Sequence, residues 1–231
     1  MNASAKREYW AGGLFFLVLA TAMVHLAIAL TAFNPANQPT GYIAQNEVSD
    51  FNLRSGTETL FRTEYEKEFY SGNLYAYRIN AAGEFSADAE TWAGGAATHI
   101  DAQNFDTGRF IATMKDDGTG TAFRWSGTSS LSAAQAALIG DATLGPDILN
   151  YLRGDRSNEV QLGVGSFHQR GSALGDIVHS RPYFVSDSTD PTIFVGANDG
   201  MLHAFNADQV SGGDERWAYV PSMLLSKIKN L

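Results

Sequence analysis

Three aspartate side chains could together bind a cation: Asp187, Asp190 and Asp199. Aspartate is commoner in turns than at metal sites, because its carboxylate hydrogen-bonds the backbone of the turn. All three lie among the Ser, Thr, Pro and Gly residues typical of loops. We therefore expect turns at these positions, and no metal site is predicted.

Histidine and serine side chains are the next candidates for chemistry. His168, His179 and His203 lack a zinc-binding spacing such as His-Glu-x-x-His, so we expect structural roles for them. Asp176, His179 and Ser180 are residue types found in hydrolases. However, the sequence has no Gly-x-Ser-x-Gly turn, and neighbouring residues on a strand point to opposite faces. No catalytic residue is predicted.

Most of these residues lie in a stretch where short β-branched and aromatic runs alternate with turn residues, positions 174–221. Residues 184–185 and 193–195 flank a polar loop, which predicts two paired strands. Residues 198–200, Asn-Asp-Gly, predict a tight turn because glycine tolerates positive φ. Residues 201–205 predict a third strand. The stretch is typical of a strand–turn–strand meander, the unit from which propeller blades are built.

One pattern, Gly-x-Leu-x-Ala-aromatic followed later by Trp, occurs twice in the sequence. Its members are Gly72, Leu74, Ala76 and Trp92 in the first copy and Gly200, Leu202, Ala204 and Trp217 in the second. We expect the glycine to open a hairpin, Leu and Ala to share one face, and the Trp to hold one blade against its neighbour. Repetition of this kind indicates a propeller or a solenoid.

Between the two copies, the sequence predicts a hairpin over residues 110–125. It also predicts two helices, residues 132–139 and 146–152, each ended by a glycine. The predicted fold class is therefore mainly β, with short helical insertions. We expect an incomplete, truncated β-propeller over residues 60–231, preceded by an N-terminal hydrophobic helix.

The N-terminal residues carry a membrane signal. Lys6 and Arg7 precede a run, residues 10–33, whose only ionisable side chain is His25. Its densest part is longer than the roughly 7–15 residues of a signal-peptide core and close to the ~20 that cross a bilayer. Residues 1–33 are predicted to be a signal peptide or a membrane anchor, with membrane contact through residues 10–33. Positive charge before the run places the rest outside the cytoplasm.

Composition narrows the function classes. The 231 residues include no cysteine and carry a net charge of −9. An acidic chain without a basic stripe disfavours nucleic acid as a partner.

Residues 34–59 are rich in polar residues without a sustained period, which predicts a linker.

Longer motifs resemble the type IV pilus tip-associated adhesins of the PilC/PilY family. They occupy residues 148–156, 174–182 and 195–205, and the segment at 71–74 is similar to the one that leads into the family's C-terminal β-propeller. The resemblance implies an exported, non-catalytic protein that promotes pilus extension and surface attachment. It implies minor pilins as partners, together with host or abiotic surfaces.

The resemblance also implies two kinds of site. The tripeptide Arg153, Gly154 and Asp155 stands where some family members have a motif linked to integrin binding, and an exposed loop could present it. Alternatively, Gly154 caps a helix, Arg153 favours the helix C-terminus and Asp155 hydrogen-bonds the next turn. Family members bind calcium through an Asp-x-Asp-x-Asp loop, which this sequence lacks, so no cofactor is identified.

Three function classes compete. At ~40–45 residues per blade a seven-bladed ring needs about 300 residues, so we expect residues 60–231 to be a fragment of a longer pilus biogenesis and adhesion protein. A quinoprotein-like propeller dehydrogenase is an alternative, because its tryptophan-docking repeats are similar to the Gly-x-Leu-x-Ala-aromatic pattern. A non-catalytic envelope scaffold is the third class.

Overall fold

A computed structural model describes residues 42–48, 58–80, 82, 84, 90–160, 167–185 and 189–230, with residues 42–48 described by their backbone. Contacts divide the chain into residues 1–38 and residues 39–231, and every described residue belongs to the second unit. The predicted signal peptide or membrane anchor, residues 1–33, lies outside the described residues. Within the described ranges, no helix combines the length and the apolar character that a membrane span needs.

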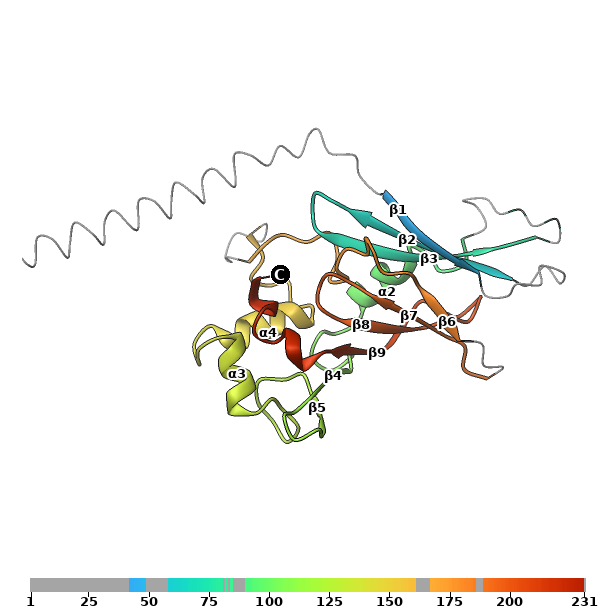
Figure 1. The fold of residues 1–231 in the computed structure, drawn as a ribbon. Coiled ribbons are helices and arrows are strands. Elements are labelled where there is room, and N and C mark those ends of the chain that lie inside the picture. The colour runs from blue at the N-terminus through green and yellow to red at the C-terminus, as the bar shows by residue number, and fades with distance from the viewer. Residues whose placement is uncertain are drawn as a thin grey trace, which may run out of the picture. The chain divides into compact units, whose positions relative to one another are not determined.

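The first sheet contains three antiparallel strands in the order β1-β2-β3 (Figure 1). Strand β1 spans Tyr42–Val48, β2 spans Thr59–Glu66 and β3 spans Ser71–Arg78. The turn between β2 and β3 contains Tyr70, whose φ is 49°. Strand β1 lies inside the stretch 34–59, for which we expected a linker. Its backbone pairs with β2 along its whole length, and this pairing is not encoded in local composition.

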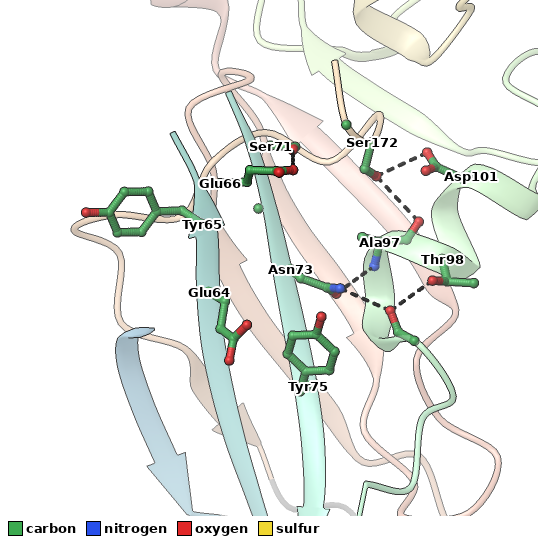
Figure 2. Close-up of a pocket in the computed structure, with 13 residues that line it drawn as sticks. Glu64, Tyr65, Glu66, Ser71, Asn73, Tyr75, Ala97, Thr98, Asp101 and Ser172 are labelled. Atoms are coloured by element: carbon green, nitrogen blue, oxygen red, sulfur yellow. Dashed lines mark hydrogen bonds between the residues drawn. The ribbon is translucent and has the colours of Figure 1, made fainter. Parts of the chain in front are cut away.

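The N-terminus of helix α2, Gly95–Ala102, is capped by a side chain from β3. Its N-cap residue, Gly94, has no side chain that could accept from the first-turn N–H groups, which need partners. Asn73 Oδ1 accepts from the backbone N–H of Ala97 at 3.0 Å, and Asn73 Nδ2 donates to the carbonyl of Gly94 at 3.0 Å (Figure 2). The sequence analysis predicts no helix here, because the capping side chain lies on another element.

The second sheet contains six strands in the order β5-β4-β9-β8-β7-β6. Their bounds are Gly120–Ala122 for β5, Ile111–Met114 for β4, Glu215–Val220 for β9, Leu202–Asn206 for β8, Thr192–Gly196 for β7 and Tyr183–Val185 for β6. Strands β6 to β9 pair antiparallel with their neighbours in chain order, which confirms the predicted meander. Strand β4 joins β9 in parallel and carries the predicted hairpin with β5.

Both predicted helices are present. Helix α3, Ala133–Ile139, starts with a capping box, in which Ser132 Oγ accepts from the N–H of Gln135 and Gln135 Oε1 accepts from the N–H of Ser132. Helix α4, Gly145–Arg153, ends at Gly154, whose φ of 115° favours glycine. Two short 3-10 helices, Ser222–Leu224 and Ile228–Asn230, follow β9.

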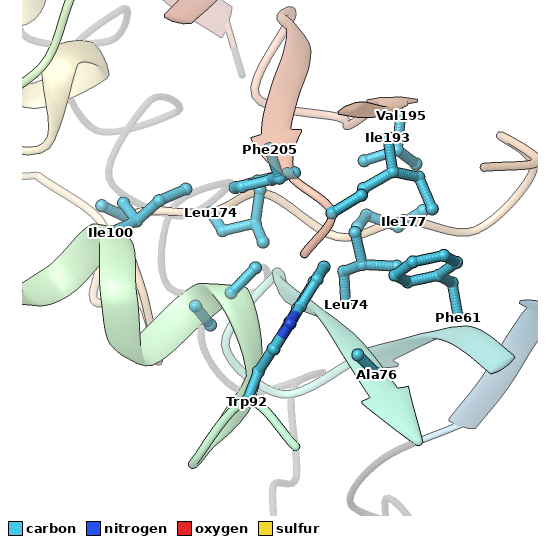
Figure 3. Close-up of a cluster of buried hydrophobic side chains, with 14 residues drawn as sticks. Phe61, Leu74, Ala76, Trp92, Ile100, Leu174, Ile177, Ile193, Val195 and Phe205 are labelled. Atoms are coloured by element: carbon cyan, nitrogen blue, oxygen red, sulfur yellow. The ribbon is translucent and has the colours of Figure 1, made fainter. Parts of the chain in front are cut away.

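The two sheets and α2 share one apolar core (Figure 3). Leu74 and Phe61 from the first sheet meet Phe205 from β8, and all three side chains are completely buried. Trp92 lies among them with its ring centre 5.4 Å from that of Phe61. Its indole Nε1 donates to the carbonyl of Asp208 at 2.9 Å, so this side chain links the two sheets.

A second core lies between the second sheet and the helices. Leu149 and Leu152 of α4 pack there with Val220 of β9 and with Leu225 and Ile228 of the C-terminal 3-10 segment. Figure 1 shows α4 beside this C-terminal segment. The helical insertion therefore covers one end of the sheet.

The two copies of the repeated pattern do not place their leucines alike. Leu74 is fully buried in the core between the sheets, whereas Leu202 is 38 % exposed. Leu202 lines a shallow hollow with Trp217 on the sheet's other face, and Trp217 packs on Phe194 with ring centres 5.7 Å apart. The two copies therefore turn different faces to the core: β3 turns Leu74 and Ala76 inside, whereas β8 turns His203 and Phe205 inside, and residue type alone did not reveal that difference.

The fold class is confirmed as mainly β with a few helices. Strands β6 to β9 form a four-stranded antiparallel meander, and strands β4 and β5 extend the same sheet.

Candidate functional site

The motifs that the sequence analysis singled out meet at closely packed glycines. The N–H of Gly72 in β3 donates to the carbonyl of Leu174 at 3.0 Å. A Cβ on Gly72 would collide with the carbonyl of Gly175, and a Cβ on Gly175 would collide with the backbone of Asp199. Glycine is required where backbones approach this closely. Segments far apart in the sequence are thus stacked at the turn between β7 and β8.

Four ionisable side chains form a buried charge network beneath this turn: Asp199, His203, Glu215 and Arg109. His203 Nε2 lies 3.0 Å from Asp199 Oδ2, and His203 Nδ1 lies 2.7 Å from Glu215 Oε1. Arg109 donates from Nε and NH2 to the two oxygens of Glu215 at 2.7 and 2.8 Å. The side chain of Asp199 is 9 % exposed, and the other three are 0–1 % exposed.

The partners in this network hold its members charged. Burial alone would lower the pKa of His203, but the carboxylates of Asp199 and Glu215 outweigh it and raise the pKa to about 9. Burial would likewise raise the pKa of Glu215, yet the hydrogen bonds from Arg109 and His203 lower it to about 2. The pKa of Asp199 is lowered against burial by His203 and by the N–H of Gly175. At neutral pH, two cations therefore face two anions.

The network joins elements and is enclosed by protein. Asp199 also accepts from the backbone N–H groups of Gly175 and Met201, both at 3.0 Å. Arg109 NH1 donates to the carbonyl of Arg153 at the end of α4 at 2.7 Å. Removing one charge from such a network would leave its partner buried and uncompensated. We infer that the network fixes the relative positions of the turn, β8, β9 and α4.

Sequence reasoning did not single out Arg109 or Glu215. Arg109 lies two residues before β4 and Glu215 is the first residue of β9, and charged residues at strand ends usually face solvent. Only His203 carries a local sign of burial in the sequence, because it is a polar residue between apolar neighbours on a strand. The expected structural role of His203 agrees with its burial.

The tripeptide takes the arrangement that we gave as the alternative to an exposed loop. Arg153 is 1 % exposed and its guanidinium donates to the carbonyls of Phe123, Phe105 and Asp106 at 2.8–3.1 Å. Asp155 is half-buried, and its side chain accepts from the N–H of Ser157 at 2.9 Å. Of the two alternatives, the structure has the helix-capping one, because the last turn of α4 packs the Arg153 side chain inward.

The other residues with candidate chemistry have structural partners. Asp190 pairs with Arg216, far from the network that holds Asp199, and Asp187 lies outside the described residues. Asp176 Oδ2 accepts from Asn198 Nδ2 at 3.0 Å. Ser180 Oγ accepts from the N–H of Gly196 at 2.9 Å, which ties its loop to β7. Asp176 and Ser180 therefore each have a partner within the fold.

A first pocket of about 560 Å³ lies between the β2–β3 hairpin and α2 (Figure 2). Three carboxylates from β2 and α2 line it, and each has a partner: Glu64 pairs with Arg62, Glu66 accepts from Ser71, and Asp101 accepts from Ser172. In the described part of the chain, no group of three or more His, Cys, Asp or Glu side chains could hold a metal ion.

A second pocket of about 580 Å³ lies directly over the buried charge network. Its walls come from four segments: Tyr70 in the β2–β3 turn, Tyr151 in α4, His168 and Arg170 in one loop, and Asp176 beside Asn198. Aromatic rings and a few polar groups converge here, as in many binding sites.

Fold and site together describe a β-rich protein in which the glycine motifs allow separate segments to pack closely. Comparison with curated proteins makes the class specific: the chain is similar to the type IV pilus biogenesis factors called PilY1. It is 28 % identical to PilY1 of Pseudomonas aeruginosa strain PAK over 85 % of its own length, and 28 % identical to a PilY1 homolog of Xylella fastidiosa over 87 %. A second Xylella fastidiosa homolog is 35 % identical over 35 % of the chain.

These matches confirm the predicted resemblance to the PilC/PilY family. The chain spans about a fifth of the length of these relatives, 19 % of the Pseudomonas protein and 17 % of the longer Xylella match. No protein-family model matches the chain. No solved structure matches it either.

Proposed function

We propose that the chain is part of an exported, non-catalytic type IV pilus biogenesis factor that promotes pilus extension and contributes to surface attachment. The observation that carries this proposal is the match to PilY1 proteins over 85 % of the chain. The buried charge network and the glycine contacts give the motifs a physical role in one fold. Minor pilins are the partners we propose.

We further propose that strands β6 to β9 form one blade of a β-propeller. Their antiparallel order and the apolar core on their inner face support this. The outer face carries Leu202 and Trp217, apolar side chains that a neighbouring blade would cover. The first sheet, packed on the inner face, would stand in the place of the preceding blade.

Deleting the gene from its native bacterium tests the proposal. We expect loss of surface pili, measured in sheared fractions, and loss of twitching motility. Both should return when the wild-type gene is restored. Normal pili and twitching in the deletion strain would contradict the proposal and favour a non-catalytic envelope scaffold.

Replacing Asp155 with glutamate is expected to leave attachment to integrin-coated surfaces unchanged. A receptor that reads both charged side chains of the tripeptide needs Arg153, which is held inside by three carbonyl groups. Attachment of cells carrying the variant would be counted beside cells carrying Asp147→Glu, an exposed carboxylate in the first turn of the same helix. A loss confined to Asp155→Glu would establish the tripeptide as a receptor contact.

A further inference from the structure

The second pocket has an exposed tyrosine, Tyr70, at its rim, and packing of the fold alone does not require this ring. Tyr70 is 54 % exposed at its rim. Among the described residues, it is the only residue other than glycine with a positive φ. A bulky side chain in this conformation is strained, and such strain is found mainly where the surroundings hold a residue for a function. In this backbone conformation, Tyr70 holds its aromatic ring toward solvent.

Tyr70 does not stand alone at the rim. Its ring meets the imidazole of His168 edge-on, with ring centres 4.9 Å apart. The pair joins the β2–β3 turn to the loop that carries Arg170. One wall of the pocket is therefore an aromatic surface whose orientation is set by contacts between two elements.

Another part of the pocket lining is polar. Asp176 and Asn198 are joined by two hydrogen bonds: the side-chain contact at 3.0 Å and a backbone contact of Asn198 N–H to the Asp176 carbonyl at 2.9 Å. The Asp176 carboxylate is acceptor-only when ionised, and the Asn198 amide carries both donors and an acceptor. These two side chains lie on segments that the buried charge network holds in place through Asp199.

The carboxylates that line the pocket disfavour an anion, and the place that a cation would take on Tyr151 is already filled. Arg170 lies over the ring of Tyr151 with its guanidinium carbon 3.8 Å from the ring centre, and it donates to Glu159 at 3.0 Å. It therefore already occupies the position a cationic ligand would take on Tyr151. The carboxylates of Asp176 and Asp199 disfavour an anion. A neutral ligand with hydroxyl groups and one apolar face meets neither repulsion.

We propose that the second pocket binds a neutral sugar ring, with the ring's apolar C–H face on Tyr70 and its hydroxyl groups on Asp176 and Asn198. This inference deepens the attachment part of the proposed function and rests on it, since a surface glycan would be the natural source of such a ring. It assigns no role to the tripeptide.

Saturation-transfer NMR on the full chain in a mild detergent tests the inference. The probes are the methyl glycosides of glucose, galactose, mannose and N-acetylglucosamine, with choline and inorganic phosphate as charged probes. We expect at least one glycoside to bind, with the strongest transfer to its ring C–H protons, and neither charged probe to compete with it. Binding of none of the four glycosides, or tighter binding of choline or phosphate, would overturn the inference.

Tyr70→Gly is the decisive variant, because glycine tolerates positive φ and the change removes the ring without adding strain. We expect binding to weaken about tenfold or more. Tyr183→Ala removes another exposed tyrosine ring, on β6, and should leave binding unchanged. Unaltered binding by Tyr70→Gly, with a melting temperature that shows a folded chain, would overturn the inference. Pili and twitching of the deletion strain are scored separately, so the two proposals can fail independently.

Discussion

Replacing Glu215 with alanine is expected to lower the free energy of unfolding by about 3–5 kcal/mol. The change removes the only carboxylate that Arg109 contacts through its Nε and NH2, and it takes away the acceptor at His203 Nδ1. Both cations would then be buried without full compensation. Domains of this kind have total stabilities of about 5–15 kcal/mol, so the variant should be close to unfolding at growth temperature.

Urea unfolding at pH 7, followed by tryptophan fluorescence, measures this effect. Asp214→Asn is the matched control, because Asp214 precedes Glu215 in the chain and pairs with His99 at 2.8 Å while its side chain is 65 % exposed. An exposed pair of this kind contributes at most about 1 kcal/mol. Equal losses in the two variants would contradict the role that we give to the buried charge network.

Raising the pH from 6.5 to above 9 is expected to cost the chain about 3 kcal/mol of stability. The pKa of His203 lies at about 9 in the fold and near its ordinary value of 6.5 in the unfolded chain. The folded state therefore binds the proton more tightly. The contribution is fully present below pH 6.5 and is lost as the pH rises through about 9. Glu215, with a pKa of about 2, contributes above its ordinary value of 4.5 and loses that contribution as the pH falls toward 2.

The measurement is the urea midpoint of the wild type and of His203→Gln at pH 6.5, 8 and 9.5. The wild type should lose stability across this range, while the variant should start lower and change little. Burial raises the pKa values of Tyr75, Tyr77 and Tyr151 above their ordinary value of 10, which would add a loss of stability as the pH approaches and passes 10. The series therefore stops at pH 9.5, and His203→Gln keeps these tyrosines, so the difference between the two proteins reports His203. Parallel slopes for the two proteins would show that His203 is not held charged.

Local signals predicted the elements that carry their own start and stop residues. Helix α3 has its cap at Ser132, α4 has its stop at Gly154, and strands β7 and β8 flank a turn built on Gly200. Helix α2 was not predicted, because the side chain that caps it, Asn73, lies on strand β3, far from the helix in the sequence.

The site depended on contacts between residues far apart in the sequence. His203 and Glu215 belong to neighbouring strands, but the partner of Glu215, Arg109, is 106 residues away. No local pattern encodes that pairing. The repeated leucines show the same limit: Leu74 and Leu202 match by type, yet strand pairing and packing turn one inward and the other outward. The second pocket likewise draws its walls from four separate segments.

The motifs that resemble the PilC/PilY family surround a buried network of four charges that holds the fold together. ¹⁵N NMR of the His203 imidazole tests this network most directly. Both ring nitrogens should carry protons at pH 7.5, and the resonance should titrate near pH 9 with Asp199 and Glu215 still ionised. A neutral imidazole that titrates near pH 6.5 would contradict the account, because the network would then lack the cation that joins its two carboxylates.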